Sequence, residues 1–383
     1  AESYEEIYSI LSELNTANRY NYAVYDAYGT ASAAATEIAG AAEDKGMDVP
    51  EYSDTNLQVA GIQEADIVKT DGKYIYALSN DYLYIVSAFD GKLAKVSELP
   101  RSTISNDRME KNSFEMYVRD NRLIVLTYYY TYRIMGGAEP AFDLVPEKRV
   151  SIMPYYGPDV VGVEIYDISD RSNPKHLNSL SQSGSYVSSR MVGDMLYLVS
   201  NYSIYDEIDK NAPETYIPQV YKSGEGSLIE AKDICIAIDP KHRPVSAQYL
   251  VVSGIDTSGN GEIVSTKSIL GNGSTVYSSQ NNLYVAAYSQ LDTPDNVYTD
   301  ATKLYRFSLN GGHIELEAEG MVPGTIINQF SMDEWDGYFR IVTTVYSYTY
   351  SDGQDGEIVW RSIVDSKNYN ALYILDNKLK VVG

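Results

Sequence analysis

The stretch "EADIVKTDGKYIYALS" (residues 64–79) decides the fold. A strand of mixed polarity runs into a turn at Asp71-Gly72 and continues as an apolar strand. Asp-Gly is a residue pair that tolerates the positive φ of a two-residue hairpin turn. The same order recurs four times, in "FEMYVRDNRLIVLT" (114–127), "YVSSRMVGDMLYLVS" (186–200), "TVYSSQNNLYVAAY" (275–288) and "NQFSMDEWDGYFRIVTT" (328–344). A hairpin that recurs along the chain predicts a repeat architecture.

A second hairpin follows each of these five, for example "VVGVEIYDISDRSNPKHLNSL" (160–180) after the second one. Four antiparallel strands per repeat are typical of a β-propeller blade. The sequence therefore predicts an all-β protein, a β-propeller of four-stranded antiparallel blades, and leaves open whether the ring closes. The expected blades span residues 57–100, 112–181, 184–271, 273–322 and 324–383.

Residues 1–56 precede the repeats and predict an N-terminal helix and a tether. In "SYEEIYSILSELN" (3–15) Ile7, Leu11 and Leu14 recur at helical spacing, so this helix is expected to pack on the propeller. Ser3 followed by Glu6 has the spacing of a capping box. From about residue 16 the chain becomes rich in Ala, Ser, Asp and Gly, which indicates a poorly specified helix or an extended tether.

Tyrosine is unusually frequent, with 37 residues against 6 Phe and 2 Trp. Many of them lie in insertions between the second and third strands, which are expected on one face of the propeller. These insertions span residues 128–159, 201–248, 289–301 and 346–370. Rigid scaffolds commonly present functional loops, and tyrosines make stacking platforms. A preference for Tyr in half-buried strands is the alternative explanation. The predicted binding residues are Tyr128, Tyr129, Tyr130, Tyr155, Tyr156, Tyr348 and Tyr350.

The composition excludes several partners. The formal charge of −23, from 53 acidic and 30 basic residues, repels nucleic acid and anionic lipid, and it disfavours close self-association, so a monomer is expected. The longest small-apolar stretch, at 31–42, is too short and polar to span a bilayer, so direct membrane insertion is not expected. A single cysteine, Cys235, excludes an internal disulfide and a cysteine-based zinc site.

Two long stretches, "TNLQVAGIQEADIVKTDGKYIYAL" (55–78) and "IYDISDRSNPKHLNSLSQSGSYVSSRMVGDMLYLVSNY" (165–202), closely resemble a bacterial and archaeal family of secreted proteins. The proteins of that family carry a β-propeller domain distantly related to WD40 repeats. The resemblance implies a secreted or cell-surface protein, with further blades after the equivalent of Gly383. It implies no catalytic residues, because the role of the family is not established.

Carboxylates offer the main enzymatic alternative. Glu64 and Asp66 lie two residues apart on the expected innermost strand of the first blade, within the carboxylate spacing that glycosidases use. Glu115 and Arg190 occupy similar places in the second and third blades. A structural polar network around the propeller axis is the preferred interpretation of these four residues. The positions of the three histidines are typical of strand ends, for His176 and His313, and of a loop, for His242. A catalytic base is the less favoured interpretation.

No cofactor is predicted. Asp292, Asp295 and Asp300 in one insertion are weak candidates for a structural calcium ion. The segment "DTSGNGEIVSTK" (256–267) has Lys267 where a calcium loop requires a bidentate Glu, so it predicts a hairpin turn.

Three functions are compatible with these patterns. The preferred hypothesis is a non-catalytic extracellular recognition or scaffold module that binds a polysaccharide, another cell-envelope component or a protein through the tyrosine-rich insertions. A carboxylate-based glycoside hydrolase and a purely structural envelope protein are the alternatives.

Overall fold

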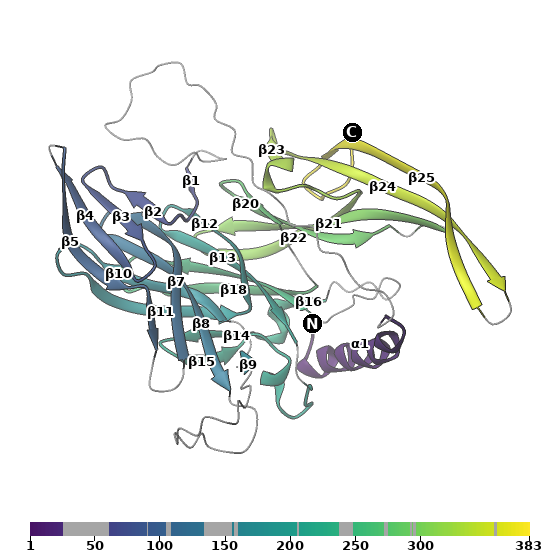
Figure 1. The fold of residues 1–383 in the computed structure, drawn as a ribbon, viewed down its shortest axis with the longest axis horizontal. Helices are drawn as coiled ribbons and strands as arrows, with labels where there is room; N and C mark the ends of the chain where they lie inside the picture. The colour runs from purple at the N-terminus through teal and green to yellow at the C-terminus, as the bar shows by residue number, and fades with distance from the viewer. Residues whose placement is uncertain are drawn as a thin grey trace, which may run out of the picture.

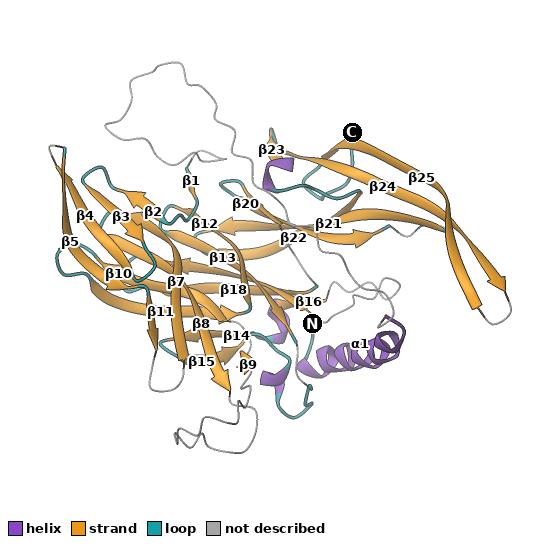
Figure 2. Ribbon diagram, in the orientation of Figure 1, coloured by secondary structure: helices purple, strands orange, loops and turns teal. Residues whose placement is uncertain are grey.

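Antiparallel strands dominate the computed structural model of this protein, and its described residues also form one long helix and three short 3-10 segments (Figures 1 and 2). The predicted all-β propeller fold is confirmed. The structure describes residues 1–25, 61–89, 91–104, 109–133, 155–156, 160–204, 207–236, 248–271, 275–291, 293, 296–355 and 358–383. Most of the expected tether lies outside these residues.

The first two blades are built from consecutive antiparallel strands. The first contains β2 (Val68–Thr70), β3 (Tyr74–Leu78), β4 (Tyr82–Phe89) and β5 (Lys92–Pro100). The second contains β6 (Ser102–Ile104), β7 (Met109–Arg119), β8 (Arg122–Arg133), β10 (Val160–Asp167) and β11 (Lys175–Ser183), and β9 (Tyr155–Tyr156) pairs with the end of β8.

The other three blades follow the same plan with one exception. The third contains β12 (Ser185–Val192), β13 (Met195–Ser203), β17 (Gln248–Asp256) and β18 (Glu262–Leu270). The fourth contains β19 (Thr275–Ser278), β20 (Asn282–Gln290), β21 (Val297–Asn310) and β22 (His313–Pro323). The fifth contains β23 (Met332–Trp335), β24 (Tyr338–Asp355) and β25 (Ile358–Leu375), and Val381 bridges back to Leu375 where the other blades have a fourth strand.

The hairpin turns lie at or next to the predicted positions. Asp120 and Asp336 have positive φ angles of 50°, as their two-residue turns require. In the first and fourth blades the chain turns one residue away from the prediction, at 72–73 and 280–281. The reason is that a side chain closes each turn: Asp71 Oδ1 accepts from Tyr74 N at 2.8 Å, and Ser279 Oγ accepts from Asn282 N at 3.1 Å.

The alternating strand directions define two faces of the molecule. The turn face carries the turns between the first and second and between the third and fourth strands of each blade. The insertion face carries the connections between the second and third strands. Part of the expected insertions is regular strand: β24 and β25 are each 18 residues long and form a hairpin that projects from the fifth blade (Figure 1).

The N-terminal helix α1 (Tyr4–Tyr25) packs on the 201–248 insertion, as the apolar spacing predicted that it would pack on the propeller. Ile7, Leu11 and Leu14 are buried in one cluster with residues of that insertion, among them Tyr216 and Ile229. The helix extends beyond the predicted residue 15. Ser3 Oγ accepts from Glu6 N at 3.2 Å, but the Glu6 carboxylate accepts from Glu2 N, so only half of the capping box forms.

The 201–248 insertion also extends two blades. It contains η1 (Pro213–Thr215), β14 (Gln219–Lys222), β15 (Glu225–Leu228), η2 (Ala231–Asp233) and β16 (Ile234–Ile236). β14 pairs with β11 of the second blade, and β16 pairs in parallel with β18 of the third. The insertion therefore ties the two blades and the helix together.

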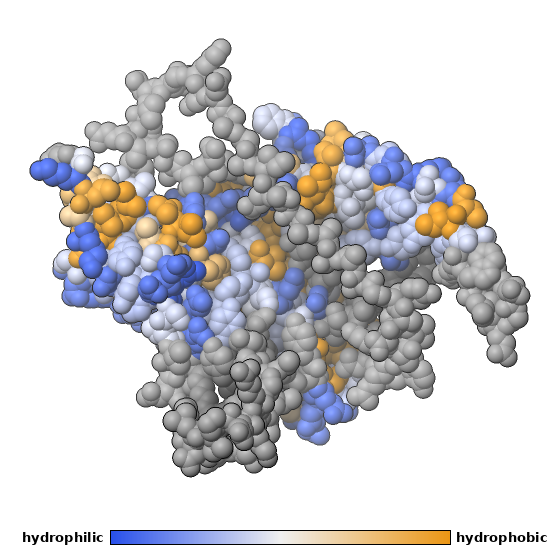
Figure 3. All heavy atoms as spheres, viewed as in Figure 1, coloured by the Kyte–Doolittle hydropathy of each residue, from blue (hydrophilic) through white to orange (hydrophobic). Residues whose placement is uncertain are grey.

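The five blades form an open arc, with β2–β5 at one end and β23–β25 at the other (Figure 1). Apolar side chains gather on the surface of both end blades (Figure 3). Leu93 of the first blade is 69% exposed, and Leu372 of the fifth is 57% exposed. Both end blades therefore present apolar side chains to solvent.

Candidate functional site

Five tyrosines form one surface on the insertion face of the fourth and fifth blades. They come from three neighbouring strands, and we call Tyr288, Tyr298, Tyr346, Tyr348 and Tyr350 the tyrosine surface. Tyr298 and Tyr348 are direct partners in the β21–β24 pairing, and their rings stack with centroids 4.6 Å apart. Tyr346 and Tyr350 contact the Tyr348 ring from either side, at 5.6 and 6.2 Å.

Hydroxyl contacts fix one end of the tyrosine surface. The Tyr288 hydroxyl contacts that of Tyr298 and donates to Asp300 at 2.8 Å, and Gln290 Nε2 donates to the Tyr298 hydroxyl at 2.9 Å. Tyr288 is nevertheless 52% exposed and Tyr346 is 38% exposed. The surface thus combines fixed rings with faces that solvent reaches.

The predicted tyrosines of the second blade behave differently from one another. Tyr128 and Tyr130 are half-buried, and Tyr128 stacks on Phe114 at 4.6 Å. Tyr129 is only 8% exposed and donates to Glu164 at 3.0 Å, so its expected role in a binding surface is wrong. Successive residues of a strand point to opposite faces, and the face that Tyr129 occupies is covered. Tyr155 and Tyr156 lie on β9, but their side chains fall outside the described residues.

One direct contact joins two of the four expected axial residues, and a third is bound by a neighbouring tyrosine. Glu64 Oε1 lies 3.2 Å from Arg190 Nη2, and the Tyr186 hydroxyl donates to Glu115 Oε2 at 3.3 Å. Arg190 also donates to Ser188 Oγ and to Gln329 Oε1 of the fourth-to-fifth blade connection. The Asp66 carboxylate accepts from Ile67 N at 2.7 Å.

The expected strand for Glu64 and Asp66 is wrong. The segment that holds them precedes β2 and pairs with other blades: β1 (Ile62–Gln63) pairs with β12 of the third blade, and Asp66 forms a backbone bridge with Met116 of the second. This segment satisfies backbone groups at the edges of two inner strands, which explains why it leaves its own blade.

Among the metal candidates, only Asp300 lies within the described residues, and its carboxylate accepts the Tyr288 hydroxyl. Asp292 and Asp295 lie outside them. In the described part of the chain, no three His, Cys, Asp or Glu side chains are arranged to hold a metal ion. Within residues 256–267, residues 257–261 form the hairpin turn between β17 and β18 that the sequence predicted.

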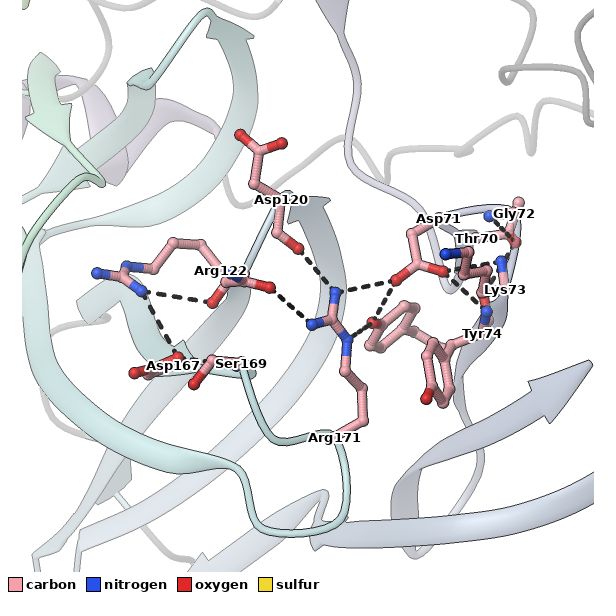
Figure 4. Close-up of polar contacts among 12 residues, drawn as sticks. Thr70, Asp71, Gly72, Lys73, Tyr74, Asp120, Arg122, Asp167, Ser169 and Arg171 are labelled. Carbon is pink, nitrogen blue, oxygen red and sulfur yellow. Dashed lines mark hydrogen bonds and ion pairs between the residues drawn. The ribbon is translucent and has the colours of Figure 1, made fainter.

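A cleft of about 970 Å³ opens between the first and second blades on the turn face, and the sequence did not predict it. Its lining includes Lys73, Tyr74 and Phe89 from the first blade and Arg119, Asp120 and Arg171 from the second. Arg171 belongs to the turn between β10 and β11, which crosses toward the first blade (Figure 4).

Arg171 joins the two walls of this cleft (Figure 4). Its guanidinium donates to Asp71 Oδ2 at 3.1 Å and to the Tyr76 hydroxyl at 3.2 Å in the first blade. In the second blade it donates to Asn121 Oδ1 at 2.7 Å and to the Asp120 carbonyl at 2.9 Å. Burial raises the pKa of Asp71, but hydrogen bonds from Tyr74, Lys73, Tyr76 and Arg171 outweigh burial and lower it.

The space between the second and third blades is much smaller at the same face, at about 210 Å³. Arg119 Nε donates there to Asp194 at 2.6 Å, and Arg122 donates to the Gly259 carbonyl at 2.8 Å. The cleft between the first and second blades is thus the larger of these two spaces. The only sequence signal for it was the long "SDRSNP" turn (169–174).

Glu164 of β10 anchors a buried polar cluster next to Tyr129. Its carboxylate accepts from Lys111 at 2.6 Å and Ser179 at 2.6 Å, and it lies 2.5 Å from His176 Nε2. Ser179 Oγ lies 3.2 Å from the same His176 nitrogen. A catalytic triad places hydroxyl and carboxylate on opposite ring nitrogens, so this arrangement is not a triad.

Comparisons with known proteins agree with the fold. Residues 52–383 match the family described as the Beta propeller domain. An uncharacterized protein of Archaeoglobus fulgidus is 25% identical over 413 residues, which cover 87% of this chain and 55% of that protein. An uncharacterized protein of Methanocaldococcus jannaschii is 24% identical over 408 residues, with 87% and 54% covered. The chain thus spans about half the length of these relatives.

The described part of the chain has no helix of the length and apolarity that a membrane span needs. The repeated four-stranded units, their order around the arc and the match over most of the chain lead to one conclusion. The chain belongs to the β-propeller domain family.

Proposed function

We propose that this domain is a non-catalytic extracellular recognition module that binds a polysaccharide of the cell envelope through the tyrosine surface. The stacked pair Tyr298–Tyr348, flanked by Tyr346 and Tyr350, is the observation that carries the proposal. Aromatic rings with fixed orientation offer apolar faces to sugar rings and lose little conformational entropy on binding.

The position of the tyrosine surface supports this function. It lies on the insertion face, on strands that extend beyond the packed part of the blades, so a long polymer can reach it without entering a closed pocket. Burial raises the pKa of Tyr288, and the nearby Asp300 carboxylate raises it further, so the hydroxyl stays protonated and its bond to Asp300 holds the ring in place.

Affinity electrophoresis in gels that contain soluble xylan, galactomannan or amylopectin tests the proposal. We expect at least one polysaccharide to retard the protein, and Y288A/Y346A to weaken that binding about tenfold because two solvent-accessible ring faces are lost. Y82A is the matched control, because Tyr82 is 37% exposed on a different blade. Retardation of the double variant equal to that of the wild type would refute the tyrosine surface.

One observation favours a second candidate, the carboxylate-based glycoside hydrolase. Burial raises the pKa of Glu115, and the negative charge of Asp66 raises it further. The hydrogen bond from Tyr186 lowers this pKa but does not outweigh the other two effects. A glycosidase needs one protonated and one ionised carboxylate. We expect no release of reducing ends from the same polysaccharides. Release that E115Q abolishes while the protein stays folded would support the hydrolase instead.

A further inference from the structure

The cleft between the first two blades is a second candidate binding site. We propose that it binds a neutral oligosaccharide, independently of the tyrosine surface on the insertion face. Its volume of about 970 Å³ lies in the upper part of the range of small-molecule sites, which leaves room for more than one sugar ring. The contacts of Arg171 to Asp71 and Asn121 hold both walls in place, so a ligand would meet an ordered site.

The charges of the cleft are balanced, which favours a ligand without net charge. Two of its cations already have acidic partners, because Arg171 pairs with Asp71 and Arg119 pairs with Asp194. An ion of either sign would find no excess of the opposite charge on the lining. The charged residues of the lining are three acids and three bases, Asp71, Asp120, Asp170, Lys73, Arg119 and Arg171.

The hydrogen-bonding groups that remain available in the cleft are of both kinds. Among the described residues, the Lys73 ammonium, the two terminal nitrogens of Arg119 and Nδ2 of Asn121 have no acceptor. The Asp120 carboxylate accepts from none of these residues, and it points away from Arg171 (Figure 4). A hydroxyl group both donates and accepts, so a ligand with many hydroxyls can bind the donors and the carboxylate together.

Two aromatic side chains give the cleft an apolar part. Tyr74 and Phe89 meet edge to face, with ring centroids 5.5 Å apart, and Val96 and Val118 also line the cleft. Phe89 is 46% exposed although charged residues share the lining. A pyranose ring has an apolar face bordered by hydroxyls, so it can lie on an exposed aromatic ring while its hydroxyls reach the polar groups.

Other classes of ligand leave part of the lining unused. An inorganic ion would make no contact with the aromatic rings, and an aliphatic ligand would leave the Asp120 carboxylate without a donor. A peptide commonly binds by adding a strand to a sheet edge. The walls of this cleft are turns whose backbone groups are already paired, since Asp71 N donates to the Tyr74 carbonyl and Asn173 N donates to the Asp170 carbonyl. A neutral oligosaccharide uses the aromatic rings, the donors and the carboxylate together.

Isothermal titration of the whole chain with neutral tetrasaccharides tests this inference. The probes are cellotetraose, β-1,4-mannotetraose, β-1,4-galactotetraose and maltotetraose. We expect at least one of them to bind saturably at millimolar concentration. Its affinity should be the same at low salt and at about 0.5 M salt, because a ligand without charge is not affected by screening.

Two substitutions in the cleft should weaken this binding. F89A should weaken it about tenfold, because the exposed ring face is lost. D120N should weaken it about fivefold, because an amide group replaces one of the two acceptor oxygens. Asn tolerates the positive φ of 50° at residue 120, and the Asp120 carboxylate makes no contact with a described residue, so this variant should fold.

Two control variants test whether the ligand binds in the cleft. Y82A removes an exposed aromatic ring of the first blade outside the cleft, and it should bind like the wild type. Y288A/Y346A should also keep full affinity, so failure of one proposal leaves the other standing. Loss of affinity in Y288A/Y346A would place the tetrasaccharide on the tyrosine surface and overturn the inference. It is also overturned if no tetrasaccharide gives saturable heat, if F89A or D120N binds like the wild type, or if tetragalacturonic acid or tetra-alanine binds as tightly as the best neutral probe.

Discussion

Glu164 shows how one residue organises polar groups inside a blade. Its carboxylate is 5% exposed and lies within hydrogen-bonding distance of Lys111, Tyr129, His176 and Ser179, which come from three other strands of the same sheet. A buried carboxylate is costly unless donors satisfy it. Burial raises the pKa of Glu164, but hydrogen bonds from Lys111 and Ser179 and the charge of Lys111 outweigh burial, so the pKa lies below its usual 4.5.

We predict that Glu164→Gln lowers the free energy of unfolding at pH 7 by about 1–3 kcal/mol, because the amide cannot accept from every donor. The folded carboxylate has the lower pKa, so its contribution is complete well above pH 4.5 and is lost as the pH falls through the folded value. The difference between the two proteins should therefore narrow in acid. Urea unfolding at pH 7 and at decreasing pH below 4.5 measures it.

Glu98→Gln is the control for this experiment. Glu98 pairs with Lys95 on the exposed surface of the first blade, and exposed ion pairs contribute little. Its substitution should change stability by less than about 0.5 kcal/mol at every pH. An equal effect of both substitutions would contradict the role given to Glu164.

At the scale of the strand, blades two to five share one register. Counted from the turn between the first two strands, the same position of the second strand pairs with a residue of the third strand in each of these blades. These pairs are Leu126–Val163, Val199–Val252, Ala286–Leu304 and Val342–Leu372. The first three pairs are at most 1% exposed, whereas Val342 and Leu372 are 48% and 57% exposed. The same position is thus core in three blades and surface in the last.

We predict that Leu304→Ala lowers the free energy of unfolding by about 2–5 kcal/mol, because it leaves a cavity between packed blades. Leu372→Ala should cost less than about 1 kcal/mol, because solvent already reaches this side chain. Chemical denaturation of both variants compares the same substitution at equivalent register positions. Equal losses would mean that the outer surface of the fifth blade is covered in solution.

At the scale of the whole molecule, the arc separates two surfaces of different chemistry. Aromatic rings gather on the insertion face of the fourth and fifth blades. Paired charges line the cleft on the turn face of the first two blades (Figure 4). The antiparallel order of each blade sends insertions and short turns to opposite faces. One repeated unit can therefore present two surfaces of different chemistry.

The sequence by itself determined the strand hairpins, the blade repeat and the helix that begins at Tyr4. These features depend on local chemistry: turn residues such as Asp336-Gly337, alternation along each strand, and apolar spacing in the helix. Alternation along a strand would also separate Tyr128 from Tyr129, but both were assigned to an insertion, where local patterns predict no alternation. They could not show which face is covered.

Only the tertiary structure decided the features that depend on a neighbouring blade. It buried Tyr129 against Glu164, took Glu64 and Asp66 away from their own blade, and exposed Leu372 where Leu304 is core. It also brought Arg171 to Asp71 across 100 residues of chain. The physical reason is that burial and long-range pairing depend on which surfaces meet, and the period of two along a strand is the same whether a neighbour or solvent lies beyond it.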